Sequence, residues 1–208
     1  MNIVIETPDD YKATTQLTFA AFETFHSPYL PPRDLPDEHY LVHIMRDSPA
    51  FIPELAFVGW QDGDIIANIM YTKSKIVRPN GDNLETITFG PLSVKPQFQN
   101  QGYGAEMVHY SLKKAHELGY GAVVIVGHPD YYSRFGFKPA KEFNLTMPEG
   151  ETFDPFMALE LEPGYLGTSG GVYYEDKIFH FEASDFRNWH EDVWSKRKFN
   201  PKDESEVI

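Results

Sequence analysis

Residues 92–104 read LSVKPQFQNQGYG, and this stretch decides the fold. A β-strand ends near Val94, a polar loop follows, and a helix begins at two glycines, Gly102 and Gly104. The first turn of a helix leaves several backbone N–H groups without an intrahelical acceptor and carries the positive end of the helix dipole. Because glycine lets a phosphate group approach the main chain closely, the stretch predicts an anion site built from backbone amides.

Two other phosphate-binding motifs do not fit this stretch. A P-loop needs a lysine directly after its last glycine, and no lysine follows Gly104. A dinucleotide-binding turn needs a third glycine where Met107 stands, together with a parallel βαβ context. A tight strand-to-helix turn that binds no ligand stays open as the structural alternative.

The residues before this stretch predict an antiparallel meander. Residues 55–60, 65–77 and 84–94 are rich in β-forming side chains, and turn signals at 61–64 and 79–82 separate them. Gly90-Pro91 interrupts the third run, and a proline cannot donate a ladder hydrogen bond. We therefore expect a bulge or a splayed strand near residues 90–92.

Further elements follow from hydrophobic periodicity and from capping residues. Thr7 and Pro8 are typical of a helix start. The expected strands are 2–6, 122–126, 156–161 and 172–181, and the expected helices are 7–25, 37–46, 102–118 and 129–135. The tail 196–208 is polar and is expected to be frayed.

Two blocks of this sequence resemble the GNAT (GCN5-related) N-acetyltransferase family. Gln99-x-x-Gly102-x-Gly104 after a strand is similar to the pyrophosphate-binding motif of that family. Residues 122–137 read AVVIVGHPDYYSRFGF and resemble the next block, a buried strand and a short helix ending in Tyr-x-x-x-Gly-Phe. The sequence of this second block is similar to that of an uncharacterised bacterial branch of acetyltransferases. Strong similarity covers roughly residues 84–140.

The resemblance implies an α/β (α+β) architecture. The GNAT acyl-CoA N-acyltransferase fold has a mixed sheet of about six to seven strands with helices on both faces. We expect residues 1–163 to form this domain and residues 164–208 to form a C-terminal extension packed on it, with 164–171 as the linker.

The resemblance also implies acetyl-CoA (coenzyme A) as cosubstrate, with no metal. The strand that carries Leu92 and Val94 would splay from the strand 122–126, and their backbone groups would hold the pantetheine arm. The amides that would hold the pyrophosphate belong to Gln99, Asn100, Gln101, Gly102, Tyr103 and Gly104.

The implied reaction is transfer of an acetyl group to a primary amine by direct attack in a ternary complex. Tyr132 falls where the family places a tyrosine acid, and a phenol with a pKa of about 10 stays protonated at neutral pH. Core packing is the alternative for Tyr132, and Tyr131 is the alternative register, expected to face elsewhere. The N–H of Val94 would polarise the carbonyl. His128, Glu85 and Asp130 are candidate bases, and none is assigned.

Residues 26–46 would lie over the acceptor end by analogy with the family. Either they form an acceptor pocket or they are a solvated loop, and the residues concerned are His26, Tyr29, His39, Tyr40 and His43. His39 and His43 have a metal-like spacing of four, but the sequence offers no third ligand nearby, so no metal is expected. Phe186, Trp189, His190 and Val193 share a helical face that packs on the body or forms a dimer contact.

Composition limits the remaining possibilities. The chain has 208 residues and 0 cysteines, which excludes disulfides and a cysteine nucleophile. A formal net charge of −13 argues against nucleic acid or an anionic membrane as partner, and no apolar run reaches the length of a membrane span. We expect a cytoplasmic monomer or homodimer with a small-molecule or peptide amine as acceptor. A non-catalytic acyl-CoA-binding sensor and a ligand-free scaffold are the alternatives. Acceptor identity and acyl chain length stay open.

Overall fold

The computed structural model describes residues 1–23 and 35–195. The strands are β1 (Asn2–Ile5), β2 (Phe57–Gln61), β3 (Asp64–Val77), β4 (Asn83–Val94), β5 (Ala122–Val126), β6 (Lys138–Pro139), β7 (Leu145–Thr146), β8 (Phe156–Glu160) and β9 (Gly171–Tyr174). The helices are α1 (Tyr11–Glu23), α2 (Glu38–Met45), α3 (Tyr103–Glu117), α4 (Pro129–Tyr132) and α5 (Ala183–Trp189).

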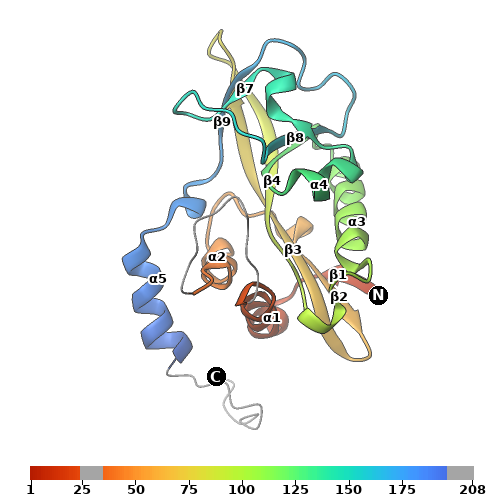
Figure 1. Cartoon of the computed structure of the whole chain (residues 1–208), viewed down its shortest axis with the longest axis vertical. Coiled ribbons are helices and arrows are strands. Elements are labelled where there is room, and N and C mark those ends of the chain that lie inside the picture. Colours follow the sequence, from red (N-terminus) through yellow and green to blue (C-terminus); the bar gives the residue numbers. More distant parts are fainter. Residues whose placement is uncertain (24–34, 196–208) are drawn as a thin grey trace.

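All nine strands belong to one mixed sheet (Figure 1). Its main path runs β1-β2-β3-β4-β5-β8-β6, and β9 pairs with both β3 and β7. The expected meander is confirmed, since β2, β3 and β4 pair antiparallel in order. The pairing of β4 with β5 is parallel. The predicted α/β class with a mixed sheet is therefore confirmed.

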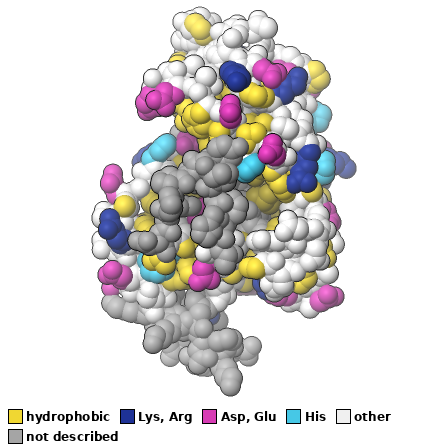
Figure 2. Space-filling model, in the orientation of Figure 1, with side chains coloured by type: hydrophobic (Ala, Val, Ile, Leu, Met, Phe, Trp, Pro, Cys, Tyr) yellow, Lys and Arg dark blue, Asp and Glu magenta, His cyan; other side chains and the backbone are white. Residues whose placement is uncertain are grey.

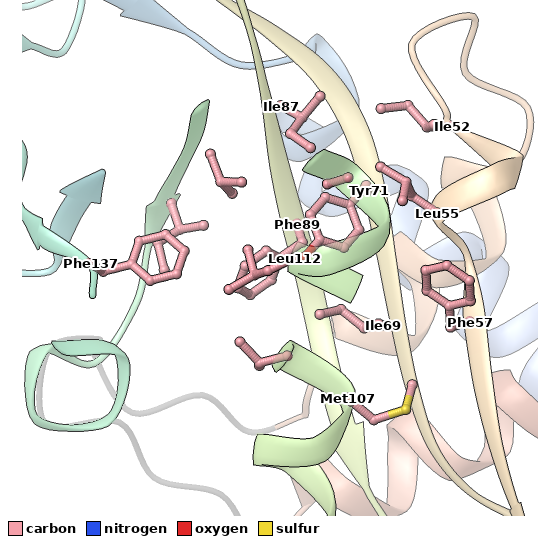
Figure 3. Packing of buried hydrophobic residues seen from close by; sticks show 14 of the residues in the cluster. Ile52, Leu55, Phe57, Ile69, Tyr71, Ile87, Phe89, Met107, Leu112 and Phe137 are labelled. Atoms are coloured by element: carbon pink, nitrogen blue, oxygen red, sulfur yellow. The ribbon is translucent and has the colours of Figure 1, made fainter. Parts of the chain in front are cut away.

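Helix α3 covers one face of the sheet and packs on the largest apolar cluster. Figure 3 shows Met107 and Leu112 of α3 pointing toward Ile69, Tyr71 and Phe89 of β3 and β4. These side chains are buried, and the odd-numbered residues of β3 supply its contribution to the cluster. Since successive strand residues point to opposite faces, the even-numbered residues of β3 lie on the other face.

Helices α1 and α2 cover that other face (Figure 1). Val42 and Met45 of α2 pack against Met70 of β3. Thr7 and Asp10 form a capping box before α1, which confirms the predicted helix start.

Two sequence expectations need correction. In the described part of the chain the sheet has nine strands rather than six to seven, because β6 and β7 are two-residue strands too short to show a period in sequence. The strand expected over 172–181 is wrong beyond Tyr174. Asp176 caps a 3-10 turn, η6 (Lys177–His180), by accepting a hydrogen bond from the N–H of Ile178. An aspartate cap of this kind competes with continued extended backbone.

The expected linker, residues 164–171, is attached to the sheet. Leu166 is fully buried, and its N–H donates to the Glu160 carboxylate at 2.8 Å. The Arg78 guanidinium donates to the carbonyl oxygens of Leu166 and Gly170. The division into residues 1–163 and 164–208 remains a prediction.

Candidate active site

Strand β4 is interrupted where the sequence places Gly90-Pro91. The peptide bond between these residues is cis. The register against β3 shifts here, from Leu92 opposite Ile69 to Phe89 opposite Tyr71. The bulge expected near residues 90–92 is therefore confirmed.

Beyond this break, no strand in residues 1–23 or 35–195 pairs with the second edge of β4. Among the described residues, the parallel register with β5 is limited to Ile87 opposite Val123. The N–H of Lys95 donates to the carbonyl oxygen of Ile66 on β3. Because strand residues alternate in the direction of their main-chain groups, those of Leu92 and Val94 point away from β3. Both residues are half-buried and present N–H and C=O groups on the side of β5.

The loop after β4 ends at the first turn of α3, with backbone donors exposed. No described residue accepts a hydrogen bond from the N–H groups of residues 100–105. Gly102 occupies the N-cap position in a left-handed conformation with φ of 93° and supplies no capping side chain. The loop is instead held by the Gln101 side chain, which donates to the carbonyl of Gln97, and the Gln99 side chain, which donates to that of Val94. This run of N–H groups can bind an anion by donating hydrogen bonds to it.

Side-chain charge on the surface does not explain an anion site. The chain carries a net charge of −13, and acidic and basic side chains are interspersed on the face drawn in Figure 2. The ammonium of Lys95 is paired with Asp64. The candidate anion site therefore depends on main-chain groups and on the helix dipole.

Tyr131 of α4 lies against the start of α3. A methyl group built on Gly104 would come within 2.7 Å of the Tyr131 hydroxyl oxygen and 3.6 Å of the Val94 side chain. The guanidinium of Arg134 stacks on the Tyr131 ring at 4.0 Å and donates to its carbonyl oxygen at 2.9 Å. Gly104 thus lets α3, β4 and α4 meet closely.

Tyr132 faces the interrupted part of β4. Its ring lies 5.7 Å from the Phe89 ring and 5.8 Å from the Phe137 ring, centroid to centroid. A methyl group built on Gly127 would overlap the Tyr132 ring at 2.4 Å, so this glycine makes room for it. The described residues supply no hydrogen-bond partner for the Tyr132 hydroxyl. Burial raises the pKa of Tyr132, so the hydroxyl stays protonated well above neutral pH.

The other acid–base candidates have different surroundings. The carbonyl of His128 accepts hydrogen bonds from the N–H groups of both Tyr131 and Tyr132, so His128 is part of the α4 start. Asp130 is exposed. Glu85 lies seven residues from Leu92 along the same strand, about 20 Å away.

The histidines of α2 form a packed aromatic cluster. His39 is fully buried, and its ring lies 5.3 Å from the Trp189 ring and 4.9 Å from the Phe19 ring. Burial, followed by the neighbouring His190, lowers the pKa of His39 to about 3. The helical face that carries Phe186 and Trp189 therefore packs against α2. The sequence alone could not identify this contact.

Two acceptor-pocket candidates, a metal site and a membrane span were also considered from the sequence. His26 and Tyr29 lie outside the described residues. Within the described ranges, no group of three or more His, Asp or Glu side chains is arranged to hold a metal ion. No helix in those ranges is long and apolar enough to cross a membrane.

The comparisons with known proteins agree with one another on the family. The family described as acetyltransferase (GNAT) domain matches residues 6–140. The uncharacterized N-acetyltransferase YhbS of Escherichia coli K12 is 31% identical over 146 residues, which cover 69% of this chain and 84% of YhbS.

Two solved structures have the same fold. A crystal structure of Escherichia coli YhbS in complex with CoA has a TM-score of 0.72 at 26% identity and covers 86% of this chain and 92% of that one. A GNAT family acetyltransferase from Brucella melitensis, in complex with acetyl-CoA, has a TM-score of 0.64 at 25% identity and covers 86% and 97% of the two chains.

Proposed function

The chain belongs to the GNAT acetyltransferase family, and from this we propose that it transfers an acetyl group from acetyl-CoA to a primary amine by direct attack in a ternary complex. The observation that carries the proposal is the run of backbone N–H groups at residues 100–105, which donate a hydrogen bond to no described residue. Beside it, the main-chain groups of Leu92 and Val94 lie on the free edge of β4. These groups fit an extended, phosphate-bearing cosubstrate.

In this proposal the loop and first turn of α3 bind the pyrophosphate through main-chain donors. The available N–H groups belong to Asn100, Gln101, Gly102, Tyr103 and Gly104. The N–H of Gln99, which the sequence also suggested, donates instead to the carbonyl oxygen of Pro96 at 3.3 Å. Leu92 and Val94 bind the pantetheine arm as an added strand would. Tyr131, whose hydroxyl lies against Gly104, borders the same region.

Acetyl-CoA supplies an activated acyl group: a C–N bond forms at the thioester carbonyl as the C–S bond breaks, the nitrogen loses a proton and the sulfur gains one. Tyr132 is positioned to donate that proton from its hydroxyl, because burial keeps the phenol protonated and no described residue uses it. The N–H of Val94 faces the free edge, where it can donate to an oxygen that gains negative charge. Water serves as proton acceptor for the amine, and no side chain is assigned this role.

A thiol-release assay with acetyl-CoA and a panel of small amines and peptides tests the proposal. We expect Tyr132→Phe to lower kcat by about 100-fold, the usual contribution of a general acid. Its affinity for acetyl-CoA, measured by calorimetry, should be that of the wild type, because the ring packing is kept.

Two results would contradict this assignment in different ways. Thiol release by Tyr132→Phe at the wild-type rate would remove Tyr132 from the mechanism. Tight acetyl-CoA binding with no thiol release from any amine would instead favour a non-catalytic acyl-CoA-binding protein.

A further inference from the structure

Four hydroxyl side chains are buried at the centre of the sheet, on the face opposite α3. Thr72 and Ser74 of β3 stand directly across from Thr88 and Thr86 of β4. The Ser74 and Thr86 hydroxyls are hydrogen-bonded at 2.8 Å. Thr72 is 0% exposed, and its hydroxyl has no hydrogen-bond partner among the described residues. A buried polar group without a partner is costly, so this patch needs an explanation other than core packing.

Strand β9 brings a phenol to this patch. The Tyr173 ring is fully buried, and its hydroxyl lies 3.5 Å from the carbonyl oxygen of Val124. Burial raises the pKa of Tyr173, and the Glu175 carboxylate raises it further. Tyr173 and Tyr174 pair with Ile76 and Lys75, so Glu175 directly follows beside Ser74. Because Tyr173 and Glu175 are two positions apart, their side chains turn to the same face of the sheet.

Glu175 is the charged group at this place. Its side chain is 16% exposed, and one carboxylate oxygen lies 3.2 Å from Nε2 of His180, which is itself 65% exposed. The other oxygen has no hydrogen-bond partner among the described residues. Burial raises the pKa of Glu175, and His180 lowers it. A carboxylate that is partly removed from water is stabilised by a cation.

The segment that carries Glu175 and His180 is held over the interruption in β4. The Phe179 ring lies 3.7 Å from a methyl group built on Gly90. Asp176 accepts hydrogen bonds from the Ser48 hydroxyl and from the N–H of Ile178, both at 3.0 Å. The segment with Glu175 and the Tyr132 ring therefore lie on opposite faces of the sheet at the interruption in β4.

We propose that this patch is the acceptor site and that Glu175 binds the acceptor as a cationic primary amine, whose ammonium releases one proton to water before the neutral nitrogen attacks the thioester. The proposal rests on the acetyl-transfer function proposed above and deepens it. If the cosubstrate occupies the side of α3, the acceptor must approach the break from the other face. There, the hydroxyls of Thr72, Thr88 and Tyr173 bind the polar groups of the amine beyond its ammonium. Glu175 and Tyr173 lie outside residues 6–140, so the family match does not assign them.

Steady-state kinetics on Glu175→Gln tests the proposal with primary alkylamines, including 1,4-diaminobutane. We expect the KM for the amine to rise by about 10- to 100-fold, because a hydrogen bond to a charge is lost while the shape of the side chain is kept. Glu182→Gln is the matched control, since it removes the same charge from an exposed position on the next segment. Its KM and the acetyl-CoA affinity of both variants should equal those of the wild type.

Calorimetric binding of 1,4-diaminobutane in the presence of CoA gives a readout independent of turnover. We expect it to weaken in Glu175→Gln, whereas 1,4-butanediol, the uncharged counterpart, should bind equally weakly to both proteins. Thr72→Val is a second variant that keeps the side-chain shape. If Thr72 has only a structural role, Thr72→Val should be equally or more stable and should keep the wild-type KM for the amine. If Thr72 binds the acceptor, the KM of Thr72→Val for the amine should rise.

The outcomes separate this inference from the proposed function. Equal amine KM and binding in Glu175→Gln, Thr72→Val and Glu182→Gln, in a wild type that acetylates the amines, would overturn the acceptor site alone. Acetylation confined to uncharged amines would also overturn it. A wild type that acetylates no amine would remove the proposed function, and the acceptor site with it.

Discussion

The contact between Gly104 and Tyr131 allows a quantitative test of how α3 meets α4. In Gly104→Ala, the new methyl group would lie 2.7 Å from the Tyr131 hydroxyl oxygen, well inside ordinary contact distance. The next atoms are the Val94 side chain at 3.6 Å and the Cζ of Tyr131 at 3.9 Å, both ordinary contacts. The clash therefore comes from one oxygen atom, and Tyr131→Phe removes it.

The expected magnitudes follow from this geometry. Overpacking costs about 1–3 kcal/mol, whereas alanine in a helix is up to about 1 kcal/mol more favourable than glycine. We expect Gly104→Ala to destabilise the wild-type background by about 1–2 kcal/mol and to be neutral or stabilising in the Tyr131→Phe background. The coupling free energy should be about 1–3 kcal/mol, the range seen for residues in direct contact.

Urea unfolding of the four proteins in this double-mutant cycle gives the coupling free energy. Calorimetry with CoA gives a second readout, since a displaced Tyr131 ring would move along the free edge of β4. We expect CoA affinity to fall by about tenfold in Gly104→Ala, equivalent to about 1.4 kcal/mol, and to recover in the double variant. Equal effects of Gly104→Ala in both backgrounds would refute the reasoning.

Three further predictions concern Tyr132, the α3 N-cap and the buried histidine. Gly127→Ala would place a methyl group 2.4 Å from the Tyr132 ring, so kcat should fall by about tenfold or more with unchanged acetyl-CoA affinity, and wild-type kcat would contradict this geometry. Gly102→Ala should lose about 1–2 kcal/mol in urea unfolding because φ is 93° while the space around the new methyl group is open; undiminished stability would show that the left-handed conformation is not needed. His39, with its pKa lowered by burial from 6.5 to about 3, takes up a proton more readily in the unfolded state, so stability should fall as the pH drops below 6.5. Between pH 7 and pH 5 the wild type should lose about 2 kcal/mol more than His39→Phe, and identical pH profiles of urea unfolding would contradict it.

Local chemical signals made the central part of the fold predictable. Two glycines after a strand indicated the start of α3, and Gly90-Pro91 indicated the interruption of β4. The family and the mixed α/β fold inferred from these residues are confirmed. The individual roles of Tyr132 and of the pyrophosphate-binding amides remain predictions.

Other features depend on contacts between distant residues and left no local signal. The packing of His39 on Trp189 joins segments 150 positions apart, and helical periodicity alone cannot pair them. The aromatic and β-branched residues after Tyr174 favour a strand by propensity, yet the single Asp176 cap ends it. Glu175 drew no attention in the sequence because only the pairing of β9 with β3 brings it toward the buried hydroxyls.

The pairing of β9 affects how the protein should be divided for laboratory work. Residues 75–77 of β3 pair with residues 172–174, and Tyr173 fills space among Ile76, Val124 and Phe156. A shortened version that stops at residue 163 would leave an uncovered strand edge beside a hole the size of a tyrosine ring. Exposed edges of this kind recruit strands from other molecules, so such a fragment should aggregate rather than serve as a minimal enzyme.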